Sequence, residues 1–235
     1  MQLSQAKVLI TGGSEGIGYE TAKQFSEAGA QVLICGRRKE LLHKASKELG
    51  VYSLVCDVAD EKSVKELVKK SIQKMNGFNV LINNAGFGYF DKLLDQDLQR
   101  FESILKTNVT GAMLVGRECA KHFVKNEYGN IINIASSAAL KGFAHGTAYV
   151  ASKFALRGMT ECWRDELRKY NVRVMLVNPS EVQTSFVANS GRDPREYTPS
   201  IMEAKEISHT ILSLVSMDDV AFVTEASIWS TNPHR

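Results

Sequence analysis

The chain has 235 residues, 44% of them apolar and 23% charged, a balance that predicts one globular domain with a substantial core rather than a disordered segment. Its formal net charge is +3, and acidic and basic residues are mixed throughout, so we expect no nucleic-acid partner. The longest apolar runs have the length of strands, which predicts neither a signal peptide nor a membrane span and favours a cytoplasmic protein.

The cysteines and histidines are scattered without the spacing of a disulfide framework or a metal site. We therefore expect reduced thiols, most of them buried, and no bound metal ion. The residues in question are Cys35, Cys56, Cys119, Cys162, His43, His122, His145, His209 and His234.

Short apolar, β-branched runs alternate with amphipathic stretches along the chain. The runs predict strands at Lys7–Ile10, Val32–Cys35, Tyr52–Val55, Val80–Ile82, Ile131–Ile134, Val172–Val177 and Val220–Thr224. The amphipathic stretches predict helices at Ile17–Ala28, Leu41–Leu49, Ser63–Met75, Leu98–Phe123, Tyr149–Lys169 and Ala204–Ser216. This rhythm predicts an α/β fold with a doubly wound parallel sheet and helices on both faces. No linker interrupts it, so we expect residues 1–235 to form a single domain.

A glycine-rich turn follows the first strand, from Thr11 to Gly18, and leads into a helix. Its glycines permit a tight turn and a close approach of the backbone, and amide groups at the start of the helix then face an anion. A strand needs a turn in any case, but the position between strand and helix favours a phosphate-binding site. The expected contacts are Gly12, Ser14, Glu15, Gly16, Ile17 and Gly18.

Charged residues follow the next two strands. An NAD-binding protein usually has an acidic residue near the end of the second strand, and this chain has Arg37 and Arg38 there. Two cations favour a 2′-phosphate and hence NADP(H), with NAD(H) as the alternative, although they could also merely begin a solvated helix. Asp57 and Val58 follow the third strand, where the carboxylate either accepts from an adenine amino group or caps its own turn.

Amide and small residues follow the fourth strand in the run Asn83-Asn84-Ala85-Gly86. The chain must pass close to a bound cofactor at this place, so Asn84, Ala85 and Gly86 are candidate contacts, and local asparagine turns are the alternative. Asn108 lies inside the long helical stretch, where an asparagine lowers helix propensity and therefore invites a functional explanation.

Tyr149 and Lys153 are four residues apart, and on a helix that spacing places the phenol and the ammonium on one face. A phenol has a pKa of about 10, so it is a poor base at neutral pH until a nearby cation favours the phenolate. Lys153 is placed to be that cation. An isolated tyrosine and lysine at this spacing usually lie on an ordinary solvated helix face. Here, however, Ser136 and Asn108 precede them at sequence separations that suggest a shared site.

The strongest loop signal runs from Pro179 to Ser200, beyond the carboxyl end of a strand. A lid over a binding crevice is expected there, at about 185–200. The residues expected either to line the substrate pocket or to pack in the core are Phe87, Tyr89, Leu140, Phe143, His145, Glu181 and Phe186.

With these motifs the chain resembles the short-chain dehydrogenase/reductases along nearly its whole length. The matching residues are T-G-x-x-x-G-x-G at Thr11 to Gly18, N-N-A-G at Asn83 to Gly86, Asn108, Ser136, Tyr149, Lys153, and Asn178-Pro179 with Val182 and Thr184. The resemblance implies a Rossmann-like sheet, NAD(P) binding, and hydride transfer between a nicotinamide and a carbonyl or alcohol. It also implies a catalytic tetrad of Asn108, Ser136, Tyr149 and Lys153. Pro179, Val182 and Thr184 are then expected at the nicotinamide end of the cofactor.

The resemblance implies a role for each member of the tetrad in reducing a ketone or aldehyde. Tyr149 supplies a proton, and Ser136 donates a hydrogen bond to the same oxygen. Lys153 holds the ribose hydroxyls and favours the tyrosinate, so both it and Tyr149 also contact the cofactor. Asn108 organises a water that connects Lys153 with solvent.

Three other functions stay open: a 3-oxoacyl-carrier-protein reductase, an NAD-linked alcohol dehydrogenase, and a non-catalytic NADP-binding sensor. Glu127 and Tyr170 stand where carrier-protein reductases use arginines for docking, which makes the thioester a minority option. The resemblance further implies a small-molecule substrate and a homodimer or homotetramer, formed through the helices near Gly111–Lys121 and Val150–Lys169.

Overall fold

Parallel strands form the central sheet of the computed structural model, which describes residues 1–190 and 196–233. Within those residues the sheet has seven strands in the order β3-β2-β1-β4-β5-β6-β9. The bounds of its strands are β1 Lys7–Thr11, β2 Gln31–Gly36, β3 Tyr52–Val55, β4 Val80–Asn83, β5 Gly129–Ile134, β6 Val172–Pro179 and β9 Glu225–Ile228. A separate pair, β7 (Val182–Gln183) and β8 (Met202–Glu203), lies beyond the end of β6.

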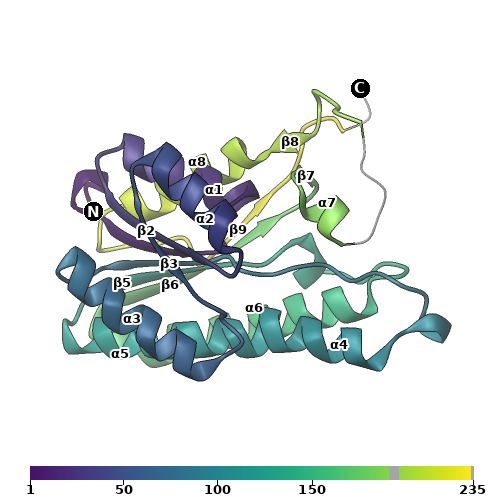
Figure 1. Ribbon diagram of the computed structural model, residues 1–235, viewed down its shortest axis with the longest axis horizontal. Helices are drawn as coiled ribbons and strands as arrows, with labels where there is room; N and C mark the ends of the chain where they lie inside the picture. The colour runs from purple at the N-terminus through teal and green to yellow at the C-terminus, as the bar shows by residue number, and fades with distance from the viewer. Residues whose placement is uncertain (191–195, 234–235) are drawn as a thin grey trace.

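Helices cover both faces of this sheet (Figure 1). On one face lie α1 (Gly16–Glu27), α2 (Lys39–Leu49) and α8 (Ala204–Ser216). On the other lie α3 (Glu61–Met75), α4 (Leu98–Leu105), α5 (Ala112–Lys125) and α6 (Thr147–Leu167). The predicted α/β fold with a doubly wound parallel sheet is therefore confirmed.

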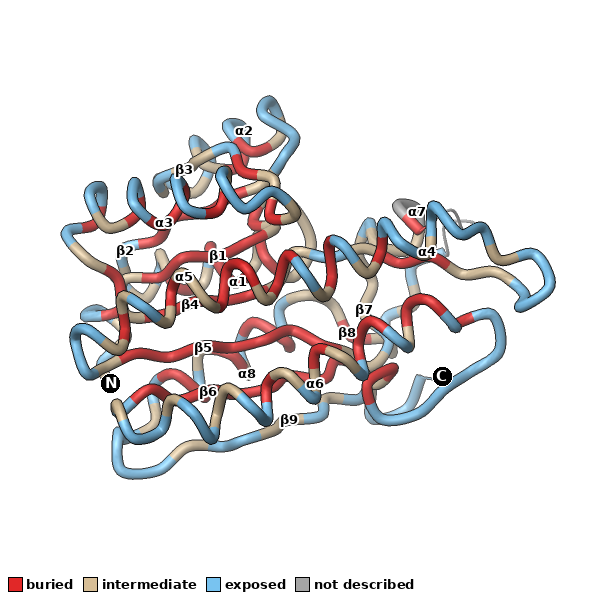
Figure 2. Tube along the Cα trace, turned by 90° about the horizontal axis from the view of Figure 1, so that it is seen from below, coloured by how far each residue is buried: buried red, intermediate tan, exposed pale blue. Residues whose placement is uncertain are grey.

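The central strands are buried and the outer faces of the helices are exposed (Figure 2). Every residue of β5 and β6 is buried, as expected for parallel strands covered on both sides, whereas the edge strand β3 is half-exposed. Within the described residues, no helix combines the length and apolar character that crossing a bilayer requires.

Local capping explains where several helices begin and end. Asp60 accepts a hydrogen bond from the amide of Ser63 at 2.6 Å and starts α3, and Asp97 accepts from the amide of Arg100 at 2.8 Å and starts α4. Gly50, with φ +65°, ends α2 in the left-handed conformation.

The strand predicted at Val220–Thr224 is wrong, because the last strand of the sheet is β9, which begins at Glu225. Val220 is fully exposed, and the amide of Ala221 bonds back to the carbonyl of Asp218 in a turn. Polar anchors select the later register: Asn178 Nδ2 donates to Glu225 Oε1 at 2.7 Å. The β-branched residues at 220–224 therefore form the connection that leads into the edge strand β9, and not the strand itself.

A hydrogen-bonded group of buried side chains ties the centre of the sheet to α6. Asn83 Nδ2 donates to Asn133 Oδ1 at 3.1 Å, and Asn133 Nδ2 donates to Thr160 Oγ1 at 2.8 Å. Asn83 lies at the end of β4, Asn133 in β5 and Thr160 in α6. Since all three side chains are buried and paired, they hold the helix in one position over the strands.

Thr11 holds the turn after β1 against the end of β4. Its fully buried hydroxyl accepts hydrogen bonds from the amides of Asn84 (3.0 Å) and Ala85 (2.9 Å). Both amides belong to irregular backbone beyond β4, so the Thr11 hydroxyl supplies the acceptor that a sheet ladder would otherwise provide.

Thr11→Val should lower the free energy of unfolding by roughly 2–3 kcal/mol, because the isosteric side chain leaves two amides without their acceptor. Urea unfolding followed by circular dichroism measures the change. Thr210→Val is the matched control: that hydroxyl donates to the Glu206 carbonyl of its own helix, and we expect a loss below about 1 kcal/mol. Equal losses in the two variants would contradict the role of Thr11.

Candidate active site

A crevice of about 1060 Å³ opens at the carboxyl ends of the parallel strands. This is the edge of an open α/β sheet at which ligands bind. The predicted site residues that line it are Gly12, Ser14, Glu15, Gly16, Ile17, Arg37, Arg38, Val58, Asn84, Ala85, Gly86, Ser136, Tyr149, Lys153, Pro179, Val182 and Thr184. Gly18, Asp57 and Asn108, also predicted, are not part of the lining.

The glycine-rich turn shapes one end of the crevice. Gly12 has φ +66°, and its amide donates to the carbonyl of Cys35 at 2.9 Å. A Cβ on Gly18 would lie 2.3 Å from the carbonyl oxygen of Gly12, so only glycine lets α1 pack directly against the turn. Gly18 thus supports the glycine-rich turn without itself lining the crevice.

The N-terminus of α1 faces this end of the crevice, and its first residues Gly16 and Ile17 belong to the lining. The N-cap residue Glu15 makes no side-chain hydrogen bond to the first turn. Amides of that turn thus have no side-chain cap, and together with the helix dipole they suit a phosphate group.

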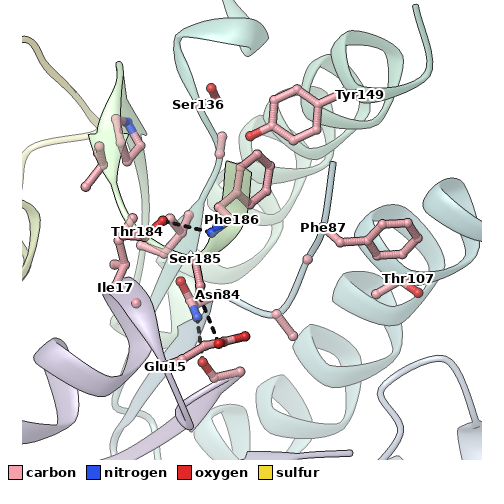
Figure 3. A pocket seen from close by; sticks show the side chains of 18 of the residues that line it. Glu15, Ile17, Asn84, Phe87, Thr107, Ser136, Tyr149, Thr184, Ser185 and Phe186 are labelled. Atoms are coloured by element: carbon pink, nitrogen blue, oxygen red, sulfur yellow. Dashed lines mark hydrogen bonds between the residues drawn. The ribbon is translucent and has the colours of Figure 1, made fainter. Parts of the chain in front are cut away.

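Glu15 connects three parts of the site. Its carboxylate pairs with the guanidinium of Arg38, and Ser185 Oγ donates to Glu15 Oε2 at 2.8 Å (Figure 3). Arg37 lines the same crevice, is exposed, and forms no salt bridge with any residue that the structure describes. Of the two predicted cations, Arg38 is thus paired with a carboxylate, whereas Arg37 has no carboxylate partner within the described part of the chain.

Asp57 caps its own turn, which is the alternative the sequence left open. Its Oδ1 accepts from the amide of Ala59 at 3.0 Å, while its own amide donates to Ser63 Oγ at 3.2 Å. A contact of Asp57 with an adenine stays a prediction.

Asn84 bridges two strand ends instead of forming a local turn. Its Nδ2 donates to the carbonyls of Thr11 (2.9 Å) and Gly12 (3.2 Å), and so joins the segment after β4 to the glycine-rich turn. Gly86 is needed for a close approach, because a Cβ there would lie 3.0 Å from Asn108 Oδ1.

Asn108 lies in a π-helical segment, Lys106–Gly111, between α4 and α5, so the helix predicted at Leu98–Phe123 contains an irregular turn. Its side chain is buried, and Nδ2 donates to Phe87 O (2.9 Å) and Ser152 Oγ (3.1 Å). Asn108 Oδ1 accepts from the amide of Phe87 at 3.1 Å. These contacts fix the loop after β4 against α6, and the predicted water-organising role stays a prediction. Such π turns frequently occur at functional sites.

Tyr149 and Lys153 share one face of α6 and point toward the crevice. Both are buried, and Lys153 Nζ lies 5.7 Å from the centroid of the Tyr149 ring. Ser136 follows β5, and its Oγ accepts from the amide of Ala138 at 3.1 Å. Figure 3 shows the side chains of Ser136 and Tyr149 near one another at the same end of the pocket.

The ammonium of Lys153 is only 6% exposed and donates to the carbonyl of Ile134 at 2.9 Å. Burial lowers the pKa of Lys153 to about 8, because the charged form loses its solvation. A bound anion or a phenolate nearby would favour the charged form again.

Some of the residues expected in the substrate pocket line the crevice and others do not. Phe87, Phe143, Glu181 and Phe186 line it, whereas Tyr89, Leu140 and His145 do not. Tyr89 is buried elsewhere, with its hydroxyl accepting from the amide of Asp97 at 2.9 Å. Phe90 lines the crevice in its place and was not predicted.

The first part of the expected lid contains α7, Phe186–Asn189, which follows Ser185 directly. Gln183 ties the far end of the segment, because its Nε2 donates to the carbonyls of Thr198 and Ile201, each at 2.9 Å. Residues 191–195 of the predicted lid lie outside the described residues.

Comparison with known proteins agrees with this geometry. The family model described as short chain dehydrogenase matches residues 6–195. The chain is 31% identical to the 3-oxoacyl-[acyl-carrier-protein] reductase of Thermotoga maritima over 235 residues, which cover 95% of each protein. The crystal structure of levodione reductase superimposes with a TM-score of 0.89 at 25% identity, covering 97% of each chain. That of NAD⁺-bound xylitol dehydrogenase gives 0.84 at 26% identity, covering 96% of this chain and 98% of the other.

Lys153→Met should stabilise the free protein at pH 7, because folding then no longer buries an ammonium. The folded-state pKa of Lys153, about 8, lies below the ordinary lysine value of 10.5. The free-energy cost of burying its ammonium is therefore fully present below pH 8 and decreases as the pH rises toward 10.5. We expect a gain on the order of 1–3 kcal/mol at pH 7 that shrinks by pH 9.5.

Urea midpoints at the two pH values measure this difference. Lys69→Met, an exposed lysine of α3, is the matched control and should show no gain that depends on pH. A Lys153→Met protein less stable than the wild type at pH 7 would contradict the electrostatic cost.

Proposed function

This chain belongs to the short-chain dehydrogenase family and is an oxidoreductase, and on that premise we propose that it reduces a ketone or aldehyde to an alcohol with NADPH. The observation that carries the proposal is the pairing of Tyr149 with the buried ammonium of Lys153, beside Ser136 in the crevice that begins at the glycine-rich turn.

The residues along the crevice fit a dinucleotide. The glycine-rich turn and the uncapped start of α1 suit a pyrophosphate, and Arg37 suits a 2′-phosphate. Thr184 lies next to the turn, since its side chain would be 3.5 Å from a Cβ on Gly16, and Val182 lines the same crevice. We propose that they, with Pro179, hold the nicotinamide end. NADP(H) is the proposed cofactor, and NAD(H) is the alternative.

The bound nicotinamide supplies the hydride that reaches the carbonyl carbon. Tyr149 donates its hydroxyl proton to the carbonyl oxygen as negative charge develops there, and Ser136 donates a hydrogen bond to the same atom. The Ser136 hydroxyl is positioned for this, because the amide of Ala138 donates to its oxygen and leaves its proton available.

Lys153 favours the deprotonated form of Tyr149 after each proton transfer. Its ammonium lies 5.7 Å from the centroid of the Tyr149 ring, and both side chains are buried, so the attraction between the ammonium and a phenolate is stronger there than in bulk water. Its lowered pKa also lets it exchange protons near neutral pH. We propose that Lys153 also holds the ribose hydroxyls, and that Asn108, which is bonded to the backbone of Phe87, organises a water that connects Lys153 with solvent.

The alternatives make different demands on the same residues. A 3-oxoacyl thioester is supported by the relative from Thermotoga maritima, and oxidation of an alcohol with NAD⁺ by the xylitol dehydrogenase structure. A non-catalytic sensor would not need Ser136, Tyr149 and Lys153 together in the crevice.

Assembly and location complete the proposal. The resemblance favours a homodimer or homotetramer through α5 and α6, and the exposed ring of Phe154 on α6 supports a contact there. A cytoplasmic location is supported by the free cysteines, of which Cys162 is exposed.

Tyr149→Phe should lower kcat/KM for reduction of butane-2,3-dione by roughly 10²–10⁴, because the proton donor is lost. NADPH binding, followed by the fluorescence of the reduced cofactor, should persist. The control is Tyr128→Phe, whose hydroxyl bonds to Asp219 outside the crevice and which should keep full activity. Unchanged turnover in Tyr149→Phe would remove this residue from the mechanism.

Arg37→Ala should weaken NADPH binding about tenfold or more and leave NADH binding nearly unchanged, since only NADPH carries the 2′-phosphate that the guanidinium meets. Calorimetric titration with each cofactor gives the two dissociation constants. Lys39→Ala removes a neighbouring cation that does not line the crevice and controls for the general loss of charge. Equal weakening of both cofactors by Arg37→Ala would refute the 2′-phosphate role.

A further inference from the structure

Three phenylalanines, which we call the aromatic wall, stand around the side chain of Tyr149: Phe90, Phe143 and Phe186. The ring centroid of Tyr149 lies 5.3 Å from that of Phe90 and 5.5 Å from that of Phe186. Phe143 extends the wall, because its centroid is 6.1 Å from that of Phe90. Figure 3 shows Phe186 close to Tyr149, with Phe87 farther along the same pocket.

The backbone is shaped to accommodate these rings. A Cβ on Gly88 would lie 2.6 Å from Phe90 and 2.8 Å from Phe186, so the two rings meet where residue 88 has no side chain. A Cβ on Gly146 would likewise lie 2.7 Å from the Phe143 ring. The wall is thus built into the loops after β4 and before α6, and into the start of α7.

Two of these rings contact the catalytic phenol itself, and this limits what the substrate can carry. Because both rings pack against the Tyr149 ring, we expect the group attached to the carbon of a carbonyl bound at Tyr149 to lie near Phe90 and Phe186. A hydroxyl of a sugar-like substrate would give up water there without gaining a partner from a phenylalanine ring.

We propose that the physiological substrate is a carbonyl compound with an aryl or alicyclic ring on the carbonyl carbon or one carbon away from it. This inference rests on the proposed carbonyl reduction and specifies its substrate class. Apolar ring faces stack against phenylalanine in offset or edge-on arrangements, and burial of the ring adds its hydrophobic contribution. Polyhydroxy ketones and thioesters of an acidic carrier protein are excluded from this class.

The test compares 1-phenylpropane-1,2-dione with butane-2,3-dione, which differ only by a phenyl group in place of a methyl group. We expect kcat/KM for the phenyl compound to be at least about tenfold higher. Erythrulose, a polyhydroxy ketone, and acetoacetyl-N-acetylcysteamine, an uncharged thioester, should both be poorer than the phenyl compound. A preference for either one, or no preference for the phenyl ring, would overturn the proposal.

Phe143→Ala tests the wall directly, because this side chain is 49% exposed and its loss should not prevent folding. The kcat/KM ratio of phenyl to methyl dione should fall about tenfold in this variant. Tyr52→Ala is the matched control, since Tyr52 is 43% exposed on β3 and does not line the crevice, and it should leave the ratio unchanged. An unchanged ratio in Phe143→Ala would count against the aromatic wall.

A binding measurement separates this inference from the proposed function. Ligand-detected NMR with 1-phenylethanol and butan-2-ol reports ring binding whether or not any carbonyl is reduced. Binding of 1-phenylethanol that weakens in Phe143→Ala, without turnover of any carbonyl, would refute the proposed reduction and retain the ring site. Turnover of butane-2,3-dione without any preference for the phenyl compound would retain the proposed reduction and refute the ring site.

Discussion

A buried ammonium organises this active site. Lys153 is almost fully buried, and the carbonyl of Ile134 at the end of β5 accepts its hydrogen bond at 2.9 Å. A buried cation is costly unless opposite charge or aligned dipoles compensate it. In the proposed reaction that compensation comes from the phenolate of Tyr149 and from an anionic dinucleotide. The group that lowers the stability of the free protein is thus the one that makes the phenol an effective proton donor.

The rest of the fold places that ammonium. Parallel strands bring the turn after β1, the segment after β4 and Ser136 after β5 to one edge of the sheet, although they are far apart in sequence. Buried polar contacts then fix the geometry, with Thr11 joining β1 to β4 and Asn133 joining β5 to α6. These contacts satisfy buried or partly buried polar groups, and they join the elements of the Rossmann-like scaffold that position the site.

Periodicity predicted the parallel sheet, and motif spacing together with the family resemblance predicted many of the residues that line the crevice. The features they missed depend on tertiary contacts. The backbone after β4 is irregular, so no regular alternation could tell whether Tyr89 or Phe90 enters the pocket. The π turn at Asn108 follows from its bonds to Phe87 and Ser152, and Glu15 takes up Arg38 only because the turn brings them together. The strand expected at Val220–Thr224 formed at Glu225 because Asn178 anchors that residue.

The titration of Lys153 tests the central claim most directly. In protein labelled with ¹⁵N at lysine Nζ, the Lys153 resonance is identified as the one missing from the spectrum of Lys153→Met. Its chemical shift in the wild-type protein is then followed against pH. The account predicts a pKa of about 8 in the free protein and a higher value once NADP⁺ is bound, because the anionic cofactor favours the charged ammonium. A resonance that titrates at the ordinary lysine value and does not respond to NADP⁺ would contradict it.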